Sequence, residues 1–179
     1  MGDRRIPIIG FAAYSGTGKT TLVTRVIPIL KDRGLKVGVV KHAHHNFVID
    51  TPGKDSYELR ESGAQQVMVV SRQRIAWVME NPLEAEPDLF ELLQNFSGHE
   101  LDLVIVEGFK HEPFTKIEVY RSGLRRPLLA KSDENVVAVA TDMPDLAEQG
   151  VETLALDDPE AIADFIIDRM RSGLLSVIE

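Results

Sequence analysis

A glycine-containing turn near the start of the chain joins an apolar run to a segment with helical periodicity. The apolar run is Ile6–Ala12, the turn that follows reads AYSGTGKT, and a helix is expected over residues 20–33. A strand, a glycine-containing turn and a helix in this order are typical of a P-loop, which holds phosphate groups at the N-terminus of a helix. The motif therefore predicts a nucleotide-binding protein.

The residue types of this turn match the chemistry of phosphate binding. Gly16 and Gly18 permit positive φ angles and a close approach of phosphate to the backbone. Lys19 is expected to reach the β- and γ-phosphates, and the Thr20 hydroxyl is expected to bind Mg²⁺. Ala13 stands where the general motif has its first glycine, and alanine is compatible with a negative φ there. The predicted nucleotide-binding residues are Ser15, Gly16, Thr17, Gly18, Lys19, Thr20 and Thr21.

Length, charge and composition restrict the other properties of the chain. Its 179 residues suit one domain, so we expect a single P-loop nucleotide-binding domain over residues 1–179. The net charge of −8 argues against charge-driven binding to nucleic acid or to an anionic membrane. Cys is absent, which excludes disulfides and thiolate metal sites. Without a signal peptide or an apolar run of roughly 20 residues, a cytoplasmic location is expected.

Apolar runs alternate with helical patterns along the chain, which predicts an α/β fold of the P-loop NTPase class. We expect a mainly parallel sheet with helices on both faces. Further strands are expected over residues 36–41, 66–71, 75–79, 101–106, 116–120 and 136–140, and further helices over 53–62, 87–96 and 159–171. The strand at 116–120 is assigned to an antiparallel edge of the sheet, and the residues beyond 171 to a frayed tail. Gly34 and Gly63 are expected to end two of the helices.

Ligands of such sheets bind beyond the carboxyl ends of the strands, which makes the polar residues there the candidates for chemistry. Glu107 follows four apolar residues, as in a Walker B strand, and is the predicted catalytic residue. Its carboxylate is expected to bind Mg²⁺, directly or through water, or to polarise an attacking water. A carboxylate that only caps a neighbouring loop is the alternative. Asp50, in the loop after the second strand, is a candidate for a further Mg²⁺ contact.

Polar residues after two other strands are candidates for contact with the nucleotide. His42 and His44 are expected to line the site, and a role in bracing the loop is the alternative for each. Asp142 follows a late strand, where P-loop GTPases carry an aspartate that accepts hydrogen bonds from guanine, although the sequence Asn-Lys-x-Asp is absent. Because adenine has no matching pair of donors, Asp142 favours GTP over ATP.

Four blocks of the sequence together resemble the MobB family of molybdopterin-guanine dinucleotide biosynthesis adapter proteins. They lie at residues 13–21, 41–45, 50–57 and 106–110 and read AYSGTGKTT, KHAHH, DTPGKDSY and VEGFK. The second and third blocks are far more specific than the P-loop, which many families share. The resemblance implies a homodimeric GTP-binding protein with weak GTPase activity and GTP and Mg²⁺ as cofactors. It also implies a MobA-like molybdopterin guanylyltransferase as partner, with molybdopterin or its guanine dinucleotide as ligand.

Two other functions stay open from the residues alone. A small-molecule kinase would use the same P-loop, with Arg121, Arg125 and Arg126 clamping phosphate. A metallochaperone GTPase would load a metal through the histidines, although the absence of Cys argues against the handling of a soft metal. Phosphoryl transfer to a small alcohol would favour the kinase, and stoichiometric metal binding by the histidines would favour the metallochaperone.

Overall fold

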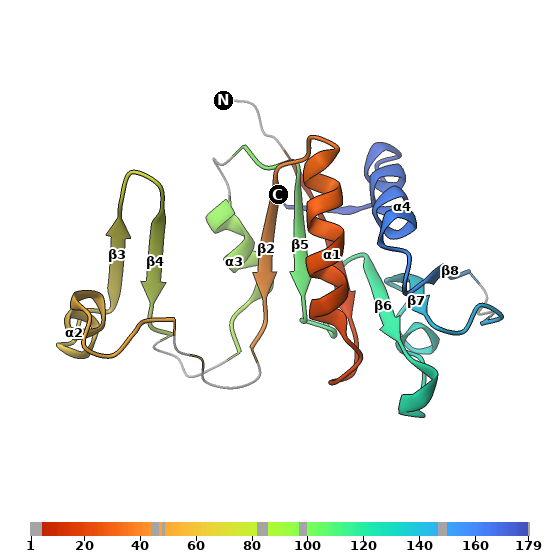
Figure 1. The fold of residues 1–179 in the computed structure, drawn as a ribbon, viewed down its shortest axis with the longest axis horizontal. Helices are drawn as coiled ribbons and strands as arrows, with labels where there is room; N and C mark the ends of the chain where they lie inside the picture. The colour runs from red at the N-terminus through yellow and green to blue at the C-terminus, as the bar shows by residue number, and fades with distance from the viewer. Residues whose placement is uncertain are drawn as a thin grey trace. The chain divides into compact units, whose positions relative to one another are not determined.

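The structure, a computed structural model, describes residues 5–43, 47, 49–81, 86–96, 100–146 and 150–178. The chain forms two compact units, drawn in Figure 1. One, called the sheet unit here, comprises Met1–His42 and Leu89–Glu179, and the other, called the hairpin unit, comprises Ala43–Asp88. The prediction of one domain over residues 1–179 did not separate these two units.

The sheet unit is built on a seven-stranded, mostly parallel sheet. Its strands are β1 (Ile6–Ala12), β2 (Val37–Lys41), β5 (Leu103–Glu107), β6 (Lys116–Tyr120), β7 (Val136–Thr141), β8 (Glu152–Ala155) and β9 (Ser176–Ile178). The strand order is β2-β5-β1-β6-β7-β8, and β9 also pairs with β1. Every residue of β5 is buried, as a continuous apolar run predicts for a strand covered on both faces. The predicted α/β class with a mainly parallel sheet is confirmed.

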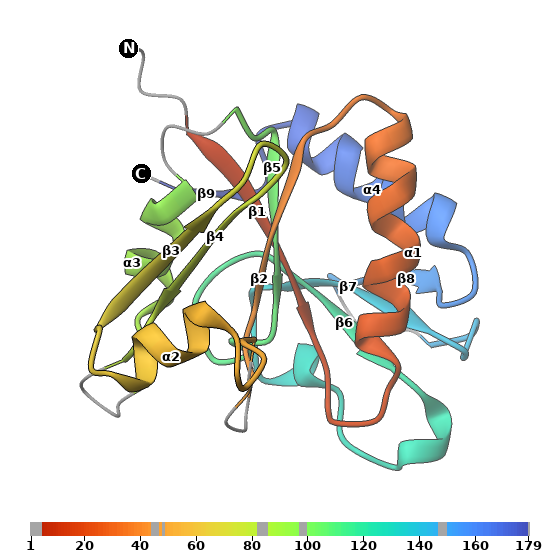
Figure 2. The same ribbon diagram turned by 60° about the vertical axis from the view of Figure 1, so that its left-hand side comes forward.

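Helices cover both faces of this sheet. On one face, α1 (Lys19–Asp32) and α4 (Pro159–Arg171) lie side by side over a shared apolar core, as Figure 2 shows. On the other face, α3 (Leu89–Leu93) buries Leu89 and Leu93 completely. Burial of one such leucine side chain contributes about 1.5–3 kcal/mol to folding. The described part of the unit also contains the short 3-10 turns η1 (Gln94–Phe96), η2 (Ser122–Leu124) and η3 (Leu129–Lys131).

Gly34 ends α1, as predicted. Its φ is +86°, its N–H donates to the Lys31 carbonyl at 2.9 Å, and the N–H of Leu35 donates to the Leu30 carbonyl at 3.1 Å. These two bonds satisfy carbonyls that the end of a helix leaves without partners, and glycine adopts the left-handed conformation that they require at little cost. The helix continues past Pro28.

Residues 116–120 form the predicted strand, but their assignment to an antiparallel edge is wrong. β6 lies inside the sheet and runs parallel to both β1 and β7. Charged residues in a strand favour an exposed edge. Here Lys116 and Glu118 are fully buried, because each has hydrogen-bond partners within the protein.

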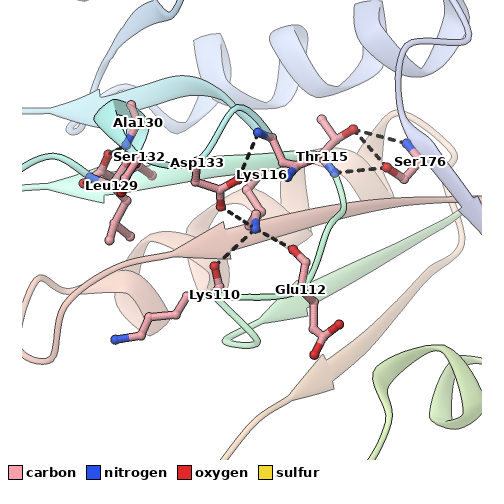
Figure 3. A network of polar contacts seen from close by, with 11 residues as sticks. Lys110, Glu112, Thr115, Lys116, Leu129, Ala130, Ser132, Asp133 and Ser176 are labelled. Carbon is pink, nitrogen blue, oxygen red and sulfur yellow. Dashed lines mark hydrogen bonds and ion pairs between the residues drawn. The ribbon is translucent and has the colours of Figure 1, made fainter.

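The residues after α4 form β9, so the expectation of a frayed tail is wrong. β9 pairs antiparallel with β1 from Ile6 to Ile8, and β6 pairs with β1 from Gly10 onwards. The two short strands are joined where they meet. The N–H of Thr115 donates to the Ser176 hydroxyl at 3.0 Å, and the N–H of Ser176 donates to the Thr115 hydroxyl at 3.3 Å (Figure 3). Together β9 and β6 complete one edge of the central strand.

The hairpin unit consists of α2 (Asp55–Glu61) and an antiparallel pair, β3 (Gln66–Val70) and β4 (Ile75–Met79). These elements and the end of α2 near Gly63 agree with the sequence prediction. Among the described residues of this unit, only Val67 is buried. Its exposed large hydrophobic residues in the two strands are Met68, Val69, Val70, Ile75, Trp77 and Met79. In neither unit does the described chain contain a helix long and apolar enough to cross a membrane.

Gly10 lets β1 pack closely against the loop that follows β5. A Cβ at this position would lie 2.4 Å from Cε2 of Phe114 and 2.7 Å from Cγ of Lys116, both fully buried. We expect Gly10→Ala to lower the free energy of unfolding by about 1–3 kcal/mol, measured by urea denaturation. Gly123→Ala is the matched control, because no described residue other than its chain neighbours has an atom within 4 Å of its Cβ position. Equal losses in the two variants would contradict this account.

Candidate functional site

The turn after β1 has the conformation of a P-loop. Gly16 and Gly18 have φ angles of +83° and +87°, so the predicted positive φ angles are confirmed. Gly18 is the N-cap of α1, and its carbonyl accepts the first helical hydrogen bond, from the N–H of Leu22 at 3.0 Å. The first N–H groups of a helix have no partner within it. The N-terminus of α1 therefore offers the donors and the positive dipole end that bind phosphate.

The pairing of β1 with β5 brings the two expected metal ligands together. Phe11 lies opposite Glu107 in this pairing, and the Thr20 hydroxyl donates to Glu107 Oε1 at 2.6 Å. Glu107 is only 6% exposed. A hydroxyl and a carboxylate are the hard oxygen donors that Mg²⁺ prefers, and protein-bound Mg²⁺ commonly completes its shell with phosphate oxygens and water. The chemistry of this pair therefore fits Mg²⁺ bound together with a nucleotide.

Lys41 belongs to the same cluster, although the sequence did not single it out. Its Nζ lies 3.0 Å from Glu107 Oε1 and 3.2 Å from Thr20 Oγ1. Lys41 is the last residue of β2 and lies opposite Glu107 in the β2–β5 pairing, which accounts for the contact. A divalent ion held by the same two oxygens would repel the ammonium group. We therefore expect ion binding and this contact of Lys41 to exclude each other.

The electrostatic environment of Lys19 favours an anion. Burial lowers the pKa of its ammonium group, and Lys41 and Lys110 lower it further, while Glu107 acts in the opposite direction. The lowered pKa reports that desolvation and repulsion among cations outweigh the attraction of one carboxylate. A phosphate group bound here would relieve both costs.

Arg121 and Asp142, which follow β6 and β7, support the P-loop. Arg121 Nε donates to the Thr17 carbonyl at 2.8 Å. The neighbouring Ser122 donates its N–H to Asp142 Oδ1 at 2.9 Å and its hydroxyl to Oδ2 at 3.5 Å. Asp142 thus holds the segment whose arginine contacts the P-loop. Its predicted hydrogen bonds to guanine stay a prediction.

His42 lies at the edge of this cluster and packs against the turn after β5. The backbone N–H of His42 donates to the Glu107 carbonyl at 2.8 Å. The centre of the His42 ring lies 4.7 Å from that of the Phe109 ring. A Cβ at Gly108, whose φ is +109°, would lie 2.6 Å from the His42 Cβ. Phe109 has a φ of +48°, which is uncommon for a bulky residue. His44 lies outside the described residues, and contact of either histidine with a ligand stays a prediction.

Asp50 belongs to the hairpin unit, where it has partners of its own. Its Oδ1 accepts a hydrogen bond from the Ser56 hydroxyl at 2.8 Å, and its Oδ2 lies 3.8 Å from Arg60 Nε. Asp55 lies in the first turn of α2, where an acidic side chain is favoured by the helix dipole. The assignment of Asp50 as a Mg²⁺ ligand stays a prediction. Within the described ranges, no three or more His, Cys, Asp and Glu side chains gather in a way that could hold a metal ion.

A buried lysine fixes the loop after β5. Lys116 Nζ donates to the carbonyls of Lys110 at 3.2 Å and Glu112 at 2.6 Å, and it pairs with Asp133 Oδ2 at 2.6 Å (Figure 3). These acceptors match the three donors of an ammonium group, as a buried charge requires. The charge of Lys116 is balanced by Asp133. The segment that carries Lys110 is held in place by this contact.

A cavity of about 670 Å³ lies elsewhere on the sheet unit. Its walls are formed by residues 130–136, 150 and 151. No P-loop residue contributes to these walls, and neither Lys41 nor Glu107 does. We therefore place the candidate nucleotide site at the P-loop and treat the cavity as separate from it.

Residues 8–142 match the sequence profile of a family described as molybdopterin guanine dinucleotide synthesis protein B, MobB. The chain belongs to the MobB family. It is 47% identical over 171 residues to the molybdopterin-guanine dinucleotide biosynthesis adapter protein of Escherichia coli K12, covering 95% of this chain and 97% of the relative. The resemblance predicted from four blocks of sequence is therefore confirmed.

The MobB fold is also known from crystal structures. The structure of a molybdopterin-guanine biosynthesis protein B (mobB) matches this chain with a TM-score of 0.71 and 31% identity, covering 92% of this chain and 99% of that one. A partial similarity to the tetraacyldisaccharide 4'-kinase of Pseudomonas aeruginosa, 32% over 108 residues, covers 58% of this chain but 31% of the kinase. This similarity concerns a part of the kinase only.

The Lys116–Asp133 pair gives the stability of the sheet unit a specific pH dependence. Burial opposes ionisation of Asp133, but hydrogen bonds from Lys116 and Asn135 outweigh it and lower the pKa of the carboxyl from its ordinary value of 3.8. A pKa lowered on folding stabilises the protein above the ordinary value, and this stabilisation is lost as the pH falls through the folded-state value. We expect Asp133→Asn to lower the free energy of unfolding by about 1–3 kcal/mol at pH 7.

The difference between wild type and Asp133→Asn should shrink in urea denaturation at pH 3. Asp164→Asn is the control, because Asp164 is an exposed partner of Arg33 and such pairs contribute about 0–1 kcal/mol. A difference for Asp133→Asn that is the same at both pH values would show that the carboxylate charge does not matter.

Proposed function

We propose that this protein binds Mg·GTP at its P-loop and acts as an adapter in molybdopterin-guanine dinucleotide biosynthesis. The observation that carries the first part is the hydrogen bond between Thr20 and Glu107, beside a turn with P-loop conformation. The second part is supported by membership of the MobB family, since the similar protein of Escherichia coli is named as the adapter of this pathway. A cytoplasmic location stays a prediction.

Each residue of the cluster has a role in this proposal. Lys19 and the N–H groups of the P-loop would hold the β- and γ-phosphates. Thr20 and Glu107 would hold Mg²⁺, which neutralises charge on the phosphate oxygens when bound. In the Mg-bound state that we propose, the Glu107 carboxylate binds the metal ion, so it has little capacity to accept a proton from water. Slow hydrolysis is therefore expected, which suits an adapter better than an enzyme of high turnover.

The proposed partners are a MobA-like guanylyltransferase and molybdopterin or its guanine dinucleotide. GTP is the nucleotide that such a partner consumes, which agrees with the predicted preference of Asp142 for guanine. The kinase alternative gains no support from Arg121, because its guanidinium group is bound to the Thr17 carbonyl. The adapter function therefore remains the proposal.

Calorimetric titration with Mg·GTP, Mg·ATP and GDP tests the nucleotide part of the proposal. We expect GTP to bind at least about tenfold more tightly than ATP, a difference of about 1.4 kcal/mol. Lys19→Ala should abolish binding, because it removes the cation that contacts the phosphates. Asp142→Asn should reduce the preference for GTP if Asp142 binds guanine. An equal loss of GTP and ATP binding would mean that Asp142 acts only through the segment of Arg121.

The same variants test the adapter part. Wild-type protein added to a purified MobA-like guanylyltransferase with molybdopterin and Mg·GTP should raise the yield of the guanine dinucleotide, and Lys19→Ala should not. Transfer of phosphate from nucleotide to a small alcohol by the wild type would instead support a kinase. A yield that is unchanged by the wild-type protein would contradict the adapter proposal.

We also propose that the protein is a homodimer that assembles through the hairpin unit. Both strands of this unit expose large hydrophobic side chains, including Trp77 at 48% and Val70 at 64% exposure. A two-stranded hairpin is marginally stable alone in water, and exposed apolar patches of this kind commonly mark protein interfaces. A second copy of the same hairpin offers a surface of the same chemistry, as a symmetric dimer requires.

Trp77→Glu should dissociate this dimer, because it places a charge in the apolar patch. The measurement is the molar mass by size-exclusion chromatography with light scattering. Leu174→Glu is the matched control, since Leu174 is 58% exposed but belongs to the sheet unit. A monomeric wild type, or equal dissociation of both variants, would contradict assembly through the hairpin unit.

A further inference from the structure

We propose that the protein has a second anion site beside the P-loop, formed by Lys110 and Arg126 around Tyr14, and that this site binds a phosphate monoester. The inference rests on the proposed function, because it assumes that the P-loop itself holds the nucleotide. It adds to that function a second ligand, which would be bound next to the triphosphate.

Two cations from different segments meet at one aromatic ring of the P-loop. Tyr14 is the residue before Ser15 in the turn, and the Nζ of Lys110 lies 5.7 Å from its ring centre. The Cζ of Arg126 lies 5.8 Å from the same centre. At these distances both cations are attracted to the ring. No carboxylate in the described part of the chain lies within ion-pair distance of either cation.

Charged groups that the nucleotide site does not use fix the segments that carry these cations. Lys116, fully buried, donates to the carbonyl of Lys110. Glu118, also fully buried, accepts hydrogen bonds from the N–H groups of Leu129 at 2.9 Å and Ala130 at 3.0 Å, shortly after Arg126 (Figure 3 shows Leu129 and Ala130). Burial raises the pKa of the Glu118 carboxyl, although these two hydrogen bonds oppose the rise.

Burial of two charged groups is costly, and replacing such groups by apolar residues is often neutral or stabilising. We therefore attribute the burial of Lys116 and Glu118 to the positions that they give to neighbouring segments, and not to a gain in the free energy of folding. Lys116 fixes the segment of Lys110, and Glu118 fixes the segment that follows Arg126. Each buried charge thereby restricts the position of one cation beside Tyr14. Cations whose positions are restricted before binding lose less entropy when an anion binds.

The balance of charge indicates what such an anion would be. Five cationic side chains of the described residues lie around the P-loop, and within that part of the chain Glu107 is the one carboxylate at ion-pair distance from any of them. The cations are Lys19, Lys41, Lys110, Arg121 and Arg126. Five positive charges less one leave four, and a triphosphate with its Mg²⁺ neutralises about two of these. A phosphate monoester carries close to two negative charges at pH 7 and would balance the remainder.

This surplus of positive charge is confined to the surroundings of the P-loop and does not follow from the overall composition. The chain as a whole has a net charge of −8. Lys and Arg together offer both a point charge and a planar fork of donors, which is a common combination for a phosphate group. Inorganic phosphate shares this chemistry with a phosphate monoester, so the two have to be distinguished by experiment.

The test is calorimetric titration of the protein saturated with a non-hydrolysable GTP analogue and Mg²⁺. The probes are sn-glycerol 3-phosphate, inorganic phosphate and, as a ligand without phosphate, glycerol. We expect the ester to bind at one site, inorganic phosphate to bind more weakly, and glycerol not to bind. Arg126→Gln and Lys110→Gln should each weaken binding of the ester at least about tenfold.

Arg125→Gln is the matched control, because it removes the same charge from the same loop and Arg125 makes no cation–π contact with Tyr14. It should leave binding of the ester within about twofold, whereas a tenfold loss corresponds to about 1.4 kcal/mol. An equal loss in Arg125→Gln, or no binding by the wild type, would overturn the proposal. So would an equal loss of GTP affinity in Arg126→Gln, because the cation would then belong to the nucleotide site.

A further variant separates this proposal from the proposed function. Lys19→Ala is expected to lose the nucleotide and to keep binding of the ester. If wild-type protein binds no nucleotide but binds the ester in a manner that depends on Arg126, the proposed function fails and the second site stands. If the nucleotide binds as expected and the ester does not bind, the proposed function stands and the second site fails.

Discussion

The pairing of β1 with β5 is the interaction on which the candidate site depends. β1 ends in the P-loop and β5 ends in Glu107, and their parallel register places Glu107 opposite Phe11. Residues far apart in the sequence thereby meet at one edge of the sheet, where Thr20 donates to Glu107. β2 adds Lys41 by the same register on the other side of β5. The continuous apolar sequence of β5 keeps this arrangement in the core, so that packing on both faces fixes the geometry of the cluster.

A second set of contacts positions the surroundings of the P-loop. Lys116, Glu118 and Asp142 each bind the backbone of a neighbouring segment. None of them is bound directly to the P-loop by these contacts. They act on the segments that follow β5 and β6, which contribute Lys110 and Arg121 to the site. The sheet therefore positions Thr20, Glu107 and Lys41. Buried or paired charges position the segments that carry Lys110 and Arg121.

The sequence predicted those features that depend on neighbouring residues. The P-loop, the end of α1 at Gly34 and the helix Pro159–Arg171 follow from local patterns of glycine, capping residues and apolar spacing. The place of β6 in the sheet, the pairing of β9 and the contact of Lys41 depend on residues distant in the sequence. Sequence alone also predicts that a charged residue such as Lys116 is exposed, because it does not show that Asp133 is its partner. The ligand contacts predicted for His42, His44, Asp50 and Asp142 require a bound nucleotide for their test.

The shared edge of β1 has a consequence for the way in which the protein is made. Within the described residues, Ile6–Ile8 obtain their partners on that edge from Ser176–Ile178 alone. During synthesis the central strand therefore has an incomplete edge until β9 has left the ribosome. An unpaired edge of this kind can be filled by a strand of another nascent chain. The time between the emergence of residue 120 and that of residue 178 from the ribosome is then the period in which the nascent chain is most exposed to incorrect pairing.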